Sequence, residues 1–307
     1  MIIREDVFSE ATKKLINDAI NINGYASEHN YDEFVSYAGK DSKPVYADFG
    51  NNKGILAIDY GDVWSVYSEI IAPEEERSSM FIEFALFLFN KNVKKIMIEC
   101  SFEFRKELLA KTKGFDKIII GNVVEHYFTP IISLDQWDPM LIGSDFSNLR
   151  KVKNRFFRNF KVEIVMNHDI KNQSIDEIKS MILAWKKNRK AKDRALHDSY
   201  INFAANGYKA NITLLLKLNG IVRGLASAIV VPNNPDTVYF NINLHDYSIP
   251  ELGDFLTVIF FDKLKSEGYR FINFGSSDEN LLKYKKKFNP IKVYDSAFFY
   301  VRNNVKV

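Results

Sequence analysis

The sequence predicts an α/β fold built from two halves that share one plan. Strand-like runs alternate with helix-like segments, and the order of these elements recurs. The segments LLAKTKGF (108–115) and LLKYKKKF (281–288) stand at corresponding places and share Leu-Leu, a lysine and a final phenylalanine. A repeat separated by about 170 residues indicates a duplicated domain rather than a solenoid. The 307 residues suffice for two such domains.

In the first half, residues 45–60 (VYADFGNNKGILAIDY) read as a hairpin with a Gly-Asn-Asn turn. Residues 62–71 predict a strand, and the apolar segment 78–92 predicts a helix. Residues 93–101 predict the next strand and 108–115 the next helix.

The second half repeats this order. Residues 211–231 predict a hairpin, because two apolar runs meet at Asn219-Gly220, a dipeptide that favours a tight turn. Residues 236–244 alternate as a half-buried strand, and 252–268 predict an apolar helix that ends at Gly268. A strand over 269–277, a helix over 281–288 and a last strand over 292–302 follow. Pro139 and Gly143 interrupt the chain between the halves, so we expect domains of residues 1–139 and 140–307.

Charge separates the halves. Residues 1–140 hold 15 lysines and arginines against 23 acidic residues, a net charge of −8, whereas residues 141–307 hold 27 against 16, a net charge of +11. Such asymmetry is typical of a domain that binds nucleic acid, a phosphorylated substrate or an anionic lipid, although a solvated charged face also explains it.

Composition argues against several classes of protein. Cys100 is the only cysteine, which excludes an intrachain disulfide, and the five histidines lack metal-ligand spacing. We therefore expect no metal and no thiol chemistry. No apolar stretch approaches the length needed to span a bilayer, and the start MIIREDVFSE lacks the pattern of a signal peptide, so we expect a cytoplasmic protein.

Three stretches carry a resemblance to a known family. They are SNLRKVKNRFFRNFKVEI (147–164), LGDFLTVIFFDKLKSEGYRFINFGSS (252–277) and YKKKF (284–288). Together with the order of elements, they resemble tandem GNAT-like acyltransferases, in particular Fem-type aminoacyltransferases and the C-terminal domain of phosphatidylglycerol lysyltransferases. The likeness is specific over residues 140–307 and holds only in plan over 1–139. The resemblance implies two GNAT-like domains, each with a mixed, mostly antiparallel sheet flanked by helices, the second catalytic.

The resemblance implies catalytic roles for Tyr284 and Lys285. GNAT enzymes often place a tyrosine on this helix to protonate the leaving group, and Fem-type enzymes use the lysine after the aromatic to steady the reacting carbonyl. The alternative is an ordinary surface helix anchored by Tyr284. The first half has Lys111 and Thr112 at these places, which favours the second half as the catalytic one.

Polar residues on and after the predicted strand 236–244 are candidates for substrate binding. Asn241, Asn243 and His245 alternate with apolar residues, so we expect them on one face together with Tyr239, and Asp246 follows. A solvent-exposed edge explains the pattern equally well. The resemblance places an anion site at the next helix, but Gly253 is the only glycine in DYSIPELGDFL, whereas coenzyme A users carry a glycine-rich loop there.

Two basic segments could bind a phosphate backbone. The first segment contains Arg150, Arg155 and Arg158. Within it, one face of a helix would carry Lys151, Arg155 and Arg158. The second, AWKKNRKAKDRALHDSY (184–200), surrounds Trp185 with cations and fits either stacked bases or a solvated amphipathic helix.

We therefore expect an acyltransferase that moves an aminoacyl group from aminoacyl-tRNA to an amine or hydroxyl acceptor, with no bound cofactor. Expected partners are tRNA and an anionic lipid or small-molecule acceptor. One alternative is a coenzyme A-dependent N-acetyltransferase with acetyl-CoA as donor. The other is a non-catalytic module that binds RNA or an anionic lipid headgroup.

Overall fold

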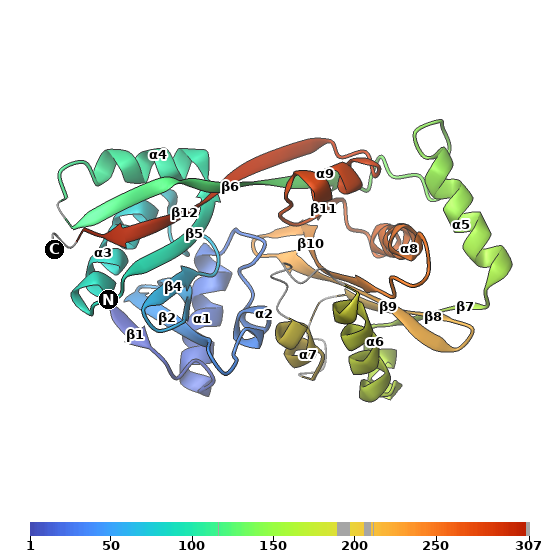
Figure 1. Cartoon of the computed structure of the whole chain (residues 1–307), viewed down its shortest axis with the longest axis horizontal. Helices are drawn as coiled ribbons and strands as arrows, with labels where there is room; N and C mark the ends of the chain where they lie inside the picture. Colours follow the sequence, from blue (N-terminus) through green and yellow to red (C-terminus); the bar gives the residue numbers. More distant parts are fainter. Residues whose placement is uncertain (116, 189–196, 206–209, 211, 305–307) are drawn as a thin grey trace.

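The computed structural model describes residues 1–115, 117–188, 197–205, 210 and 212–304, and their strands form a twelve-stranded sheet (Figure 1). The strands of the first half are β1 (Ile2–Arg4), β2 (Lys43–Gly50), β3 (Lys53–Asp59), β4 (Val63–Val66), β5 (Lys95–Ser101) and β6 (Ile118–Ser133). Those of the second half are β7 (Val162–Met166), β8 (Ile212–Leu218), β9 (Ile221–Val231), β10 (Asn234–His245), β11 (Phe271–Asn273) and β12 (Lys292–Asn303).

The strand order makes the two halves equivalent. It runs β1-β2-β3-β4-β5-β12-β6-β11-β10-β9-β8-β7, so each strand of the first half has its counterpart at the same distance from the opposite edge. The pairs β4–β5 and β10–β11 are parallel, and the neighbouring pairs are antiparallel. The shared plan expected from the sequence is therefore present in the sheet.

The halves exchange their last strands at the centre of the sheet. β12, from the end of the chain, pairs with β5 of the first half, and β6 pairs with β11 of the second half. β6 and β12 also pair with each other along most of their length, forming a ribbon that joins the halves (Figure 1). The boundary at residue 140 stays a prediction, and the sheet crosses it without a break.

Helices cover both faces of the sheet (Figure 1). One face carries α3 (Glu74–Asn90), α4 (Phe102–Lys111), α5 (Ser147–Asn159), α8 (Leu252–Ser266) and α9 (Glu279–Lys286). The other carries α1 (Glu10–Asn23), α2 (Tyr31–Ser36), α6 (Ile175–Lys187) and α7 (His197–Ala205), while a 3₁₀ helix spans Asn167–Asn172. Each half thus has two apolar cores, one on either side of its strands. Within the described residues, no helix is long and apolar enough to cross a membrane.

Local sequence explains the main turns. The β8–β9 hairpin turns at Asn219 and Gly220, whose φ angles of 53° and 82° are the left-handed values that this dipeptide adopts readily. The strand expected over 269–277 is shorter than predicted, because the chain leaves the sheet after Asn273 and turns at Gly275, with φ of 76°. This early end of β11 creates the candidate site.

Candidate active site

β10 and β11 separate near the middle of the sheet. Their parallel pairing joins residues 237–239 to 271–273 and then stops, although β10 continues to His245. The chain after β11 turns away and enters α9, whose first turn is capped by the carboxylate of Asp278. The divergence leaves space at the end of β11 for side chains from α9.

Lys285 fills that space from α9. Its side chain is buried, with 7% of the residue exposed, and its Nζ donates hydrogen bonds to the carbonyl oxygens of Phe274 and Gly275, the latter at 2.9 Å. We call these two carbonyls the lysine cradle. Burial lowers the pKa of the Lys285 ammonium to about 7, and the nearby carboxylate of Asp278 opposes that shift only partly. Near neutral pH, Lys285 is therefore balanced between a neutral amine and a cation.

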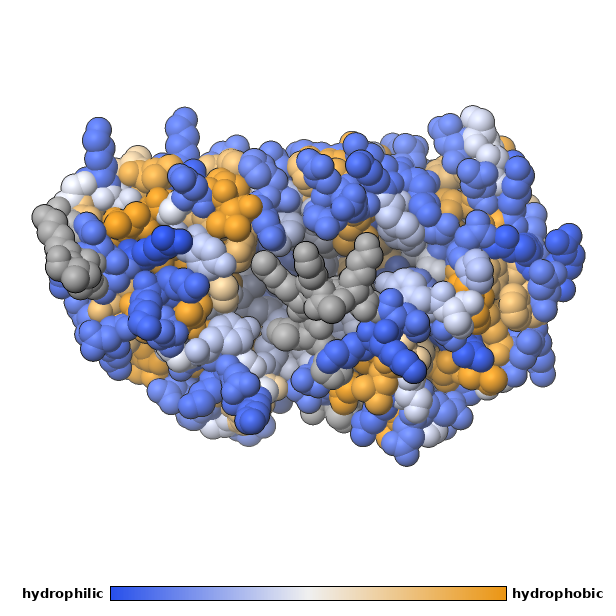
Figure 2. All heavy atoms as spheres, viewed as in Figure 1, coloured by the Kyte–Doolittle hydropathy of each residue, from blue (hydrophilic) through white to orange (hydrophobic). Residues whose placement is uncertain are grey.

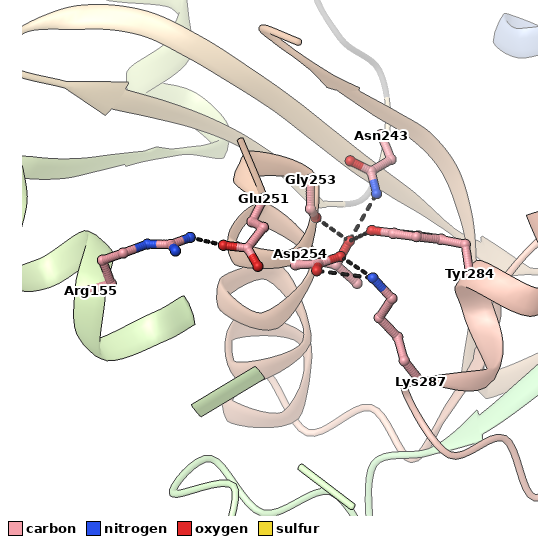
Figure 3. A network of polar contacts seen from close by, with 8 residues as sticks. Arg155, Asn243, Glu251, Gly253, Asp254, Tyr284 and Lys287 are labelled. Atoms are coloured by element: carbon pink, nitrogen blue, oxygen red, sulfur yellow. Dashed lines mark hydrogen bonds and ion pairs between the residues drawn. The ribbon is translucent and has the colours of Figure 1, made fainter. Parts of the chain in front are cut away.

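Tyr284 points toward the start of α8 (Figure 3). Its hydroxyl lies 3.4 Å from Oγ1 of Thr257 on α8, which accepts a hydrogen bond from Nδ2 of Asn243 at 2.9 Å and donates to the carbonyl of Gly253 at 2.8 Å. Nζ of Lys287 lies 4.3 Å from the centre of the Tyr284 ring. Burial holds the pKa of the Tyr284 phenol above its usual value. The Tyr284 hydroxyl therefore lies near α8 and Asn243 of β10, whereas Nζ of Lys285 lies at the end of β11.

A β-bulge in β10 corrects the expectation that its polar residues share one face. The register with β9 shifts between Tyr239 and Ile242, which reverses the side-chain alternation. Oγ of Ser227 donates a hydrogen bond to Oδ1 of Asn241 at 2.7 Å, whereas Asn243 reaches α8 on the opposite side of the sheet. Tyr239 and Asn241 thus face α2, and Asn243 and His245 face α8.

An acidic and aromatic cluster lies where Tyr239 and Asn241 face the first half, and the sequence did not reveal it. Glu28 and Glu33 come from the loop before α2 and from α2 itself, and burial raises their pKa values to about 7 and about 8. Burial raises the pKa of the Tyr239 phenol, and the nearby charges of Glu28 and Glu33 add to that rise. Tyr37 and Tyr67 complete the cluster. Figure 2 shows a hollow between the two halves of the molecule.

Two polar atoms of this cluster face each other across the halves. Oε2 of Glu33 and Nδ2 of Asn241 are buried and make no hydrogen bond of ordinary geometry within the described part of the chain, although the side chains of Asn241 and Tyr67 approach Glu33 as hydrogen-bond donors. The Asn241 amide nevertheless lies near enough to Glu33 to oppose the rise in its pKa. Buried carboxyls with raised pKa values are common at sites that receive a polar ligand.

The start of α8 is occupied by the protein's own side chains (Figure 3). Asp254 pairs with Lys287 at 2.7 Å, and Glu251 pairs with Arg155. The imidazole of His245 explains Gly253, because a Cβ there would lie 2.6 Å from the ring. These contacts border a pocket of about 480 Å³ between α5 and α8. Carboxylates at a helix N-terminus disfavour a pyrophosphate, so this feature departs from a coenzyme A site.

The remaining predicted binding residues are dispersed. Arg150 donates hydrogen bonds to the carbonyls of Leu141 and, at 3.2 Å, Gly143, whereas Arg158 is exposed near the end of α5. Asp246 forms an ion pair with Arg223 at 2.6 Å and accepts hydrogen bonds from the backbone and hydroxyl of Ser248. Asp246 therefore orders the chain after β10.

The basic segment 184–200 lies partly outside the described residues, which omit 189–196. Trp185, at its start, is buried in the core beneath α6, so its ring is not available for stacking on a base. Among the described residues, no group of three or more His, Cys, Asp or Glu side chains could hold a metal ion.

Comparisons with known proteins agree with this architecture. The family described as "Phosphatidylglycerol lysyltransferase, C-terminal" matches residues 25–296. The chain belongs to this family. No curated protein matches the chain.

Similarity to solved structures shows that this member of the family has a tandem GNAT-like fold. L-PGS from Bacillus licheniformis is 16% identical, with a TM-score of 0.65, and the match covers 96% of this chain and 92% of that one. FemX is 9% identical, with a TM-score of 0.58 and 97% of each chain covered. A tandem GNAT protein from the clavulanic acid biosynthesis pathway is 9% identical, with a TM-score of 0.54, and covers 96% and 94%. The predicted fold class is confirmed, and family membership supports a transferase.

Proposed function

We propose that this protein transfers an aminoacyl group from aminoacyl-tRNA to an amine or hydroxyl acceptor. The observation that carries the proposal is the position of Lys285 beside the acidic cluster. Gly275 marks the meeting point, because a Cβ there would lie 3.6 Å from Nζ of Lys285 and 3.4 Å from the ring of Tyr239. Tyr239 in turn faces Glu28 and Glu33.

The acidic cluster and Lys285 match two polar groups of an aminoacyl ester, its ammonium group and its reacting carbonyl. Such an ester carries a free ammonium group one carbon from its reacting carbonyl, and an acetyl group carries none. Glu28 and Glu33 would bind the ammonium, because a cation favours the charged forms of carboxyls that burial otherwise holds protonated. Lys285 would lie near the carbonyl. The cluster therefore favours an aminoacyl donor over an acetyl donor.

The chemistry requires little beyond positioning and charge. The acceptor oxygen or nitrogen attacks the ester carbonyl, loses its proton, and displaces the ribose oxygen of tRNA, which takes up a proton as it leaves. Negative charge develops on the carbonyl oxygen during the attack, and the charged form of Lys285 stabilises it. The lysine cradle fixes the direction of Nζ through two backbone carbonyls. Tyr284 as the acid that protonates the leaving oxygen stays a prediction.

Charged tRNA as donor also gives the basic second half a role. Arg158 and Lys151 are exposed on α5, where they would contact phosphates. The acceptor is expected to be an anionic lipid or a small molecule, and a cytoplasmic site of reaction follows from the donor. The coenzyme A alternative requires a pyrophosphate where Asp254 and Glu251 now lie, so it is less well supported.

The test is discharge of labelled donor. Purified protein is incubated with total tRNA charged with labelled amino acids, together with phosphatidylglycerol vesicles or small amines, and label is followed from tRNA into product. Acetyl-CoA with the same acceptors forms the parallel reaction. The proposal expects transfer from tRNA. Acetyl transfer without tRNA discharge would instead support the coenzyme A alternative, and tRNA or lipid binding without turnover the non-catalytic one.

A further inference from the structure

Asn273 occupies the last position at which β11 is paired on both sides. It aligns with Tyr239 of β10 and with Ile131 of β6, and the two parallel strands diverge immediately after it. Its side chain is partly buried and makes one contact into the second half and one into the first.

The first contact shapes the lysine cradle. Oδ1 of Asn273 accepts a hydrogen bond from the backbone N–H of Gly275 at 2.9 Å. This local bond closes a turn of the kind that asparagine side chains stabilise. Gly275 there has φ of 76°, a left-handed value that glycine adopts without strain. The turn directs the carbonyls of Phe274 and Gly275 toward Nζ of Lys285.

The second contact reaches the loop that carries the acidic cluster. Nδ2 of Asn273 donates a hydrogen bond to Oγ of Ser27, a buried residue immediately before Glu28. A neighbouring bond reinforces the junction, since Oγ of Ser276 donates to Oε1 of Glu99 on β5 at 2.8 Å. The turn that holds Lys285 and the loop that holds Glu28 are therefore tied together through one amide side chain.

We propose that Asn273 is a positioning residue that couples the lysine cradle to the loop carrying Glu28. It sets the distance between the carbonyl subsite, at Lys285, and the ammonium subsite, at Glu28 and Glu33. The effect of this coupling on catalysis rests on the proposed aminoacyl transfer, whereas its effect on the lysine cradle does not. Loss of the amide should affect both subsites, whereas loss of the Ser27 hydroxyl should affect only the subsite in the first half.

The structural test follows the ionisation of Lys285, which needs no substrate. The protein is labelled with ¹³C at lysine Cε, the Lys285 signal is assigned by its loss in Lys285→Arg, and its titration is followed by NMR. Asn273→Ala should raise the Lys285 midpoint toward that of an ordinary lysine, because an open turn admits water to the ammonium. Ser27→Ala should leave the midpoint unchanged.

Asn233→Gly is the matched control. Asn233 also ties the halves together, donating from Nδ2 to the carbonyl of Gly24 at 2.7 Å at the other end of the same loop. Its φ of 59° suits glycine, so the replacement removes the amide without backbone strain. This variant should titrate as the parent does. An unshifted midpoint in Asn273→Ala, or an equal shift in Asn233→Gly, would overturn the proposal.

Kinetics supply the second measurement. Ser27→Ala should raise KM for aminoacyl-tRNA about tenfold with kcat little changed. The variant removes the hydrogen bond from Asn273 that holds the loop of the ammonium subsite, and one such bond is worth about that factor. Asn273→Ala should also lower kcat. If Asn273→Ala does not fold, Ser27→Ala still decides the matter, since an unchanged KM would refute the coupling. A shifted Lys285 midpoint without tRNA discharge would defeat the proposed function and leave the positioning role intact.

Discussion

Replacing Glu33 by glutamine should stabilise the protein in a pH-dependent way. Burial raises the pKa of Glu33 from 4.5 to about 8, so between these values the folded state holds a proton that the unfolded state has lost. Stability attributable to this group therefore falls as pH rises from 4.5 to about 8. At pH 7 the free-energy cost is about 3 kcal/mol, since each unit of displacement is worth about 1.4 kcal/mol. A neutral glutamine avoids this cost.

The assay is urea unfolding of Glu33→Gln and the parent at pH 5 and at pH 8. We expect a gain of about 4 kcal/mol at pH 8 and a gain below about 1 kcal/mol at pH 5. The exposed Glu163 on β7 provides the control, and Glu163→Gln should change stability little at either pH. Equal changes for Glu33→Gln at the two pH values would refute the burial argument. Because Glu33 is the proposed partner of the donor ammonium, Glu33→Gln should also weaken binding of the donor while it stabilises the fold.

Three further predictions concern α9, the lysine cradle and α5. Tyr284→Phe should slow transfer by about 10²- to 10⁴-fold with folding intact if the hydroxyl is the general acid. An unchanged rate in a steady-state assay would show that Tyr284 only packs against α8. Gly275→Ala should lower both the thermal midpoint and turnover, because the φ of 76° strains alanine at the turn that holds the lysine cradle, and calorimetry showing parental stability would contradict this. Arg158→Ala should weaken tRNA binding by about 1 to 3 kcal/mol at low salt and less at high salt, so salt-independent binding would contradict a phosphate contact.

Sequence reasoning succeeded where local residues determine the structure. The β8–β9 turn follows from Asn219-Gly220, and α8 follows from its apolar residues and from Gly268 after its end. The likeness of the two halves also followed, because each repeats the same order of local elements. The aromatic-lysine pattern lies within one short segment, so the sequence could single out Lys285, whose catalytic role stays a prediction.

The parts that the sequence did not predict depend on contacts between distant residues. Strand exchange between β6 and β12 is decided by pairing across the whole chain rather than by any local pattern. The bulge in β10 defeated simple alternation, because one extra residue reverses the faces that follow. Glu28 and Glu33 resemble ordinary polar residues of a loop and a short helix, and only the fold buries them and brings Asn241 to Glu33. Burial of two acidic residues by distant parts of the chain has no local sequence signal.

Single-turnover discharge of aminoacyl-tRNA by the parent, Lys285→Ala and Lys286→Ala tests the central claim most directly. Lys285 is buried in its cradle and Lys286 is exposed at the next position of α9, so the two variants remove the same side chain from different environments. We predict that Lys285→Ala lowers the rate of discharge by about 10²- to 10³-fold, the effect of losing one stabilising group for the carbonyl oxygen, and that Lys286→Ala retains the parent rate. Discharge at the parent rate by Lys285→Ala, with the protein folded, would contradict the account.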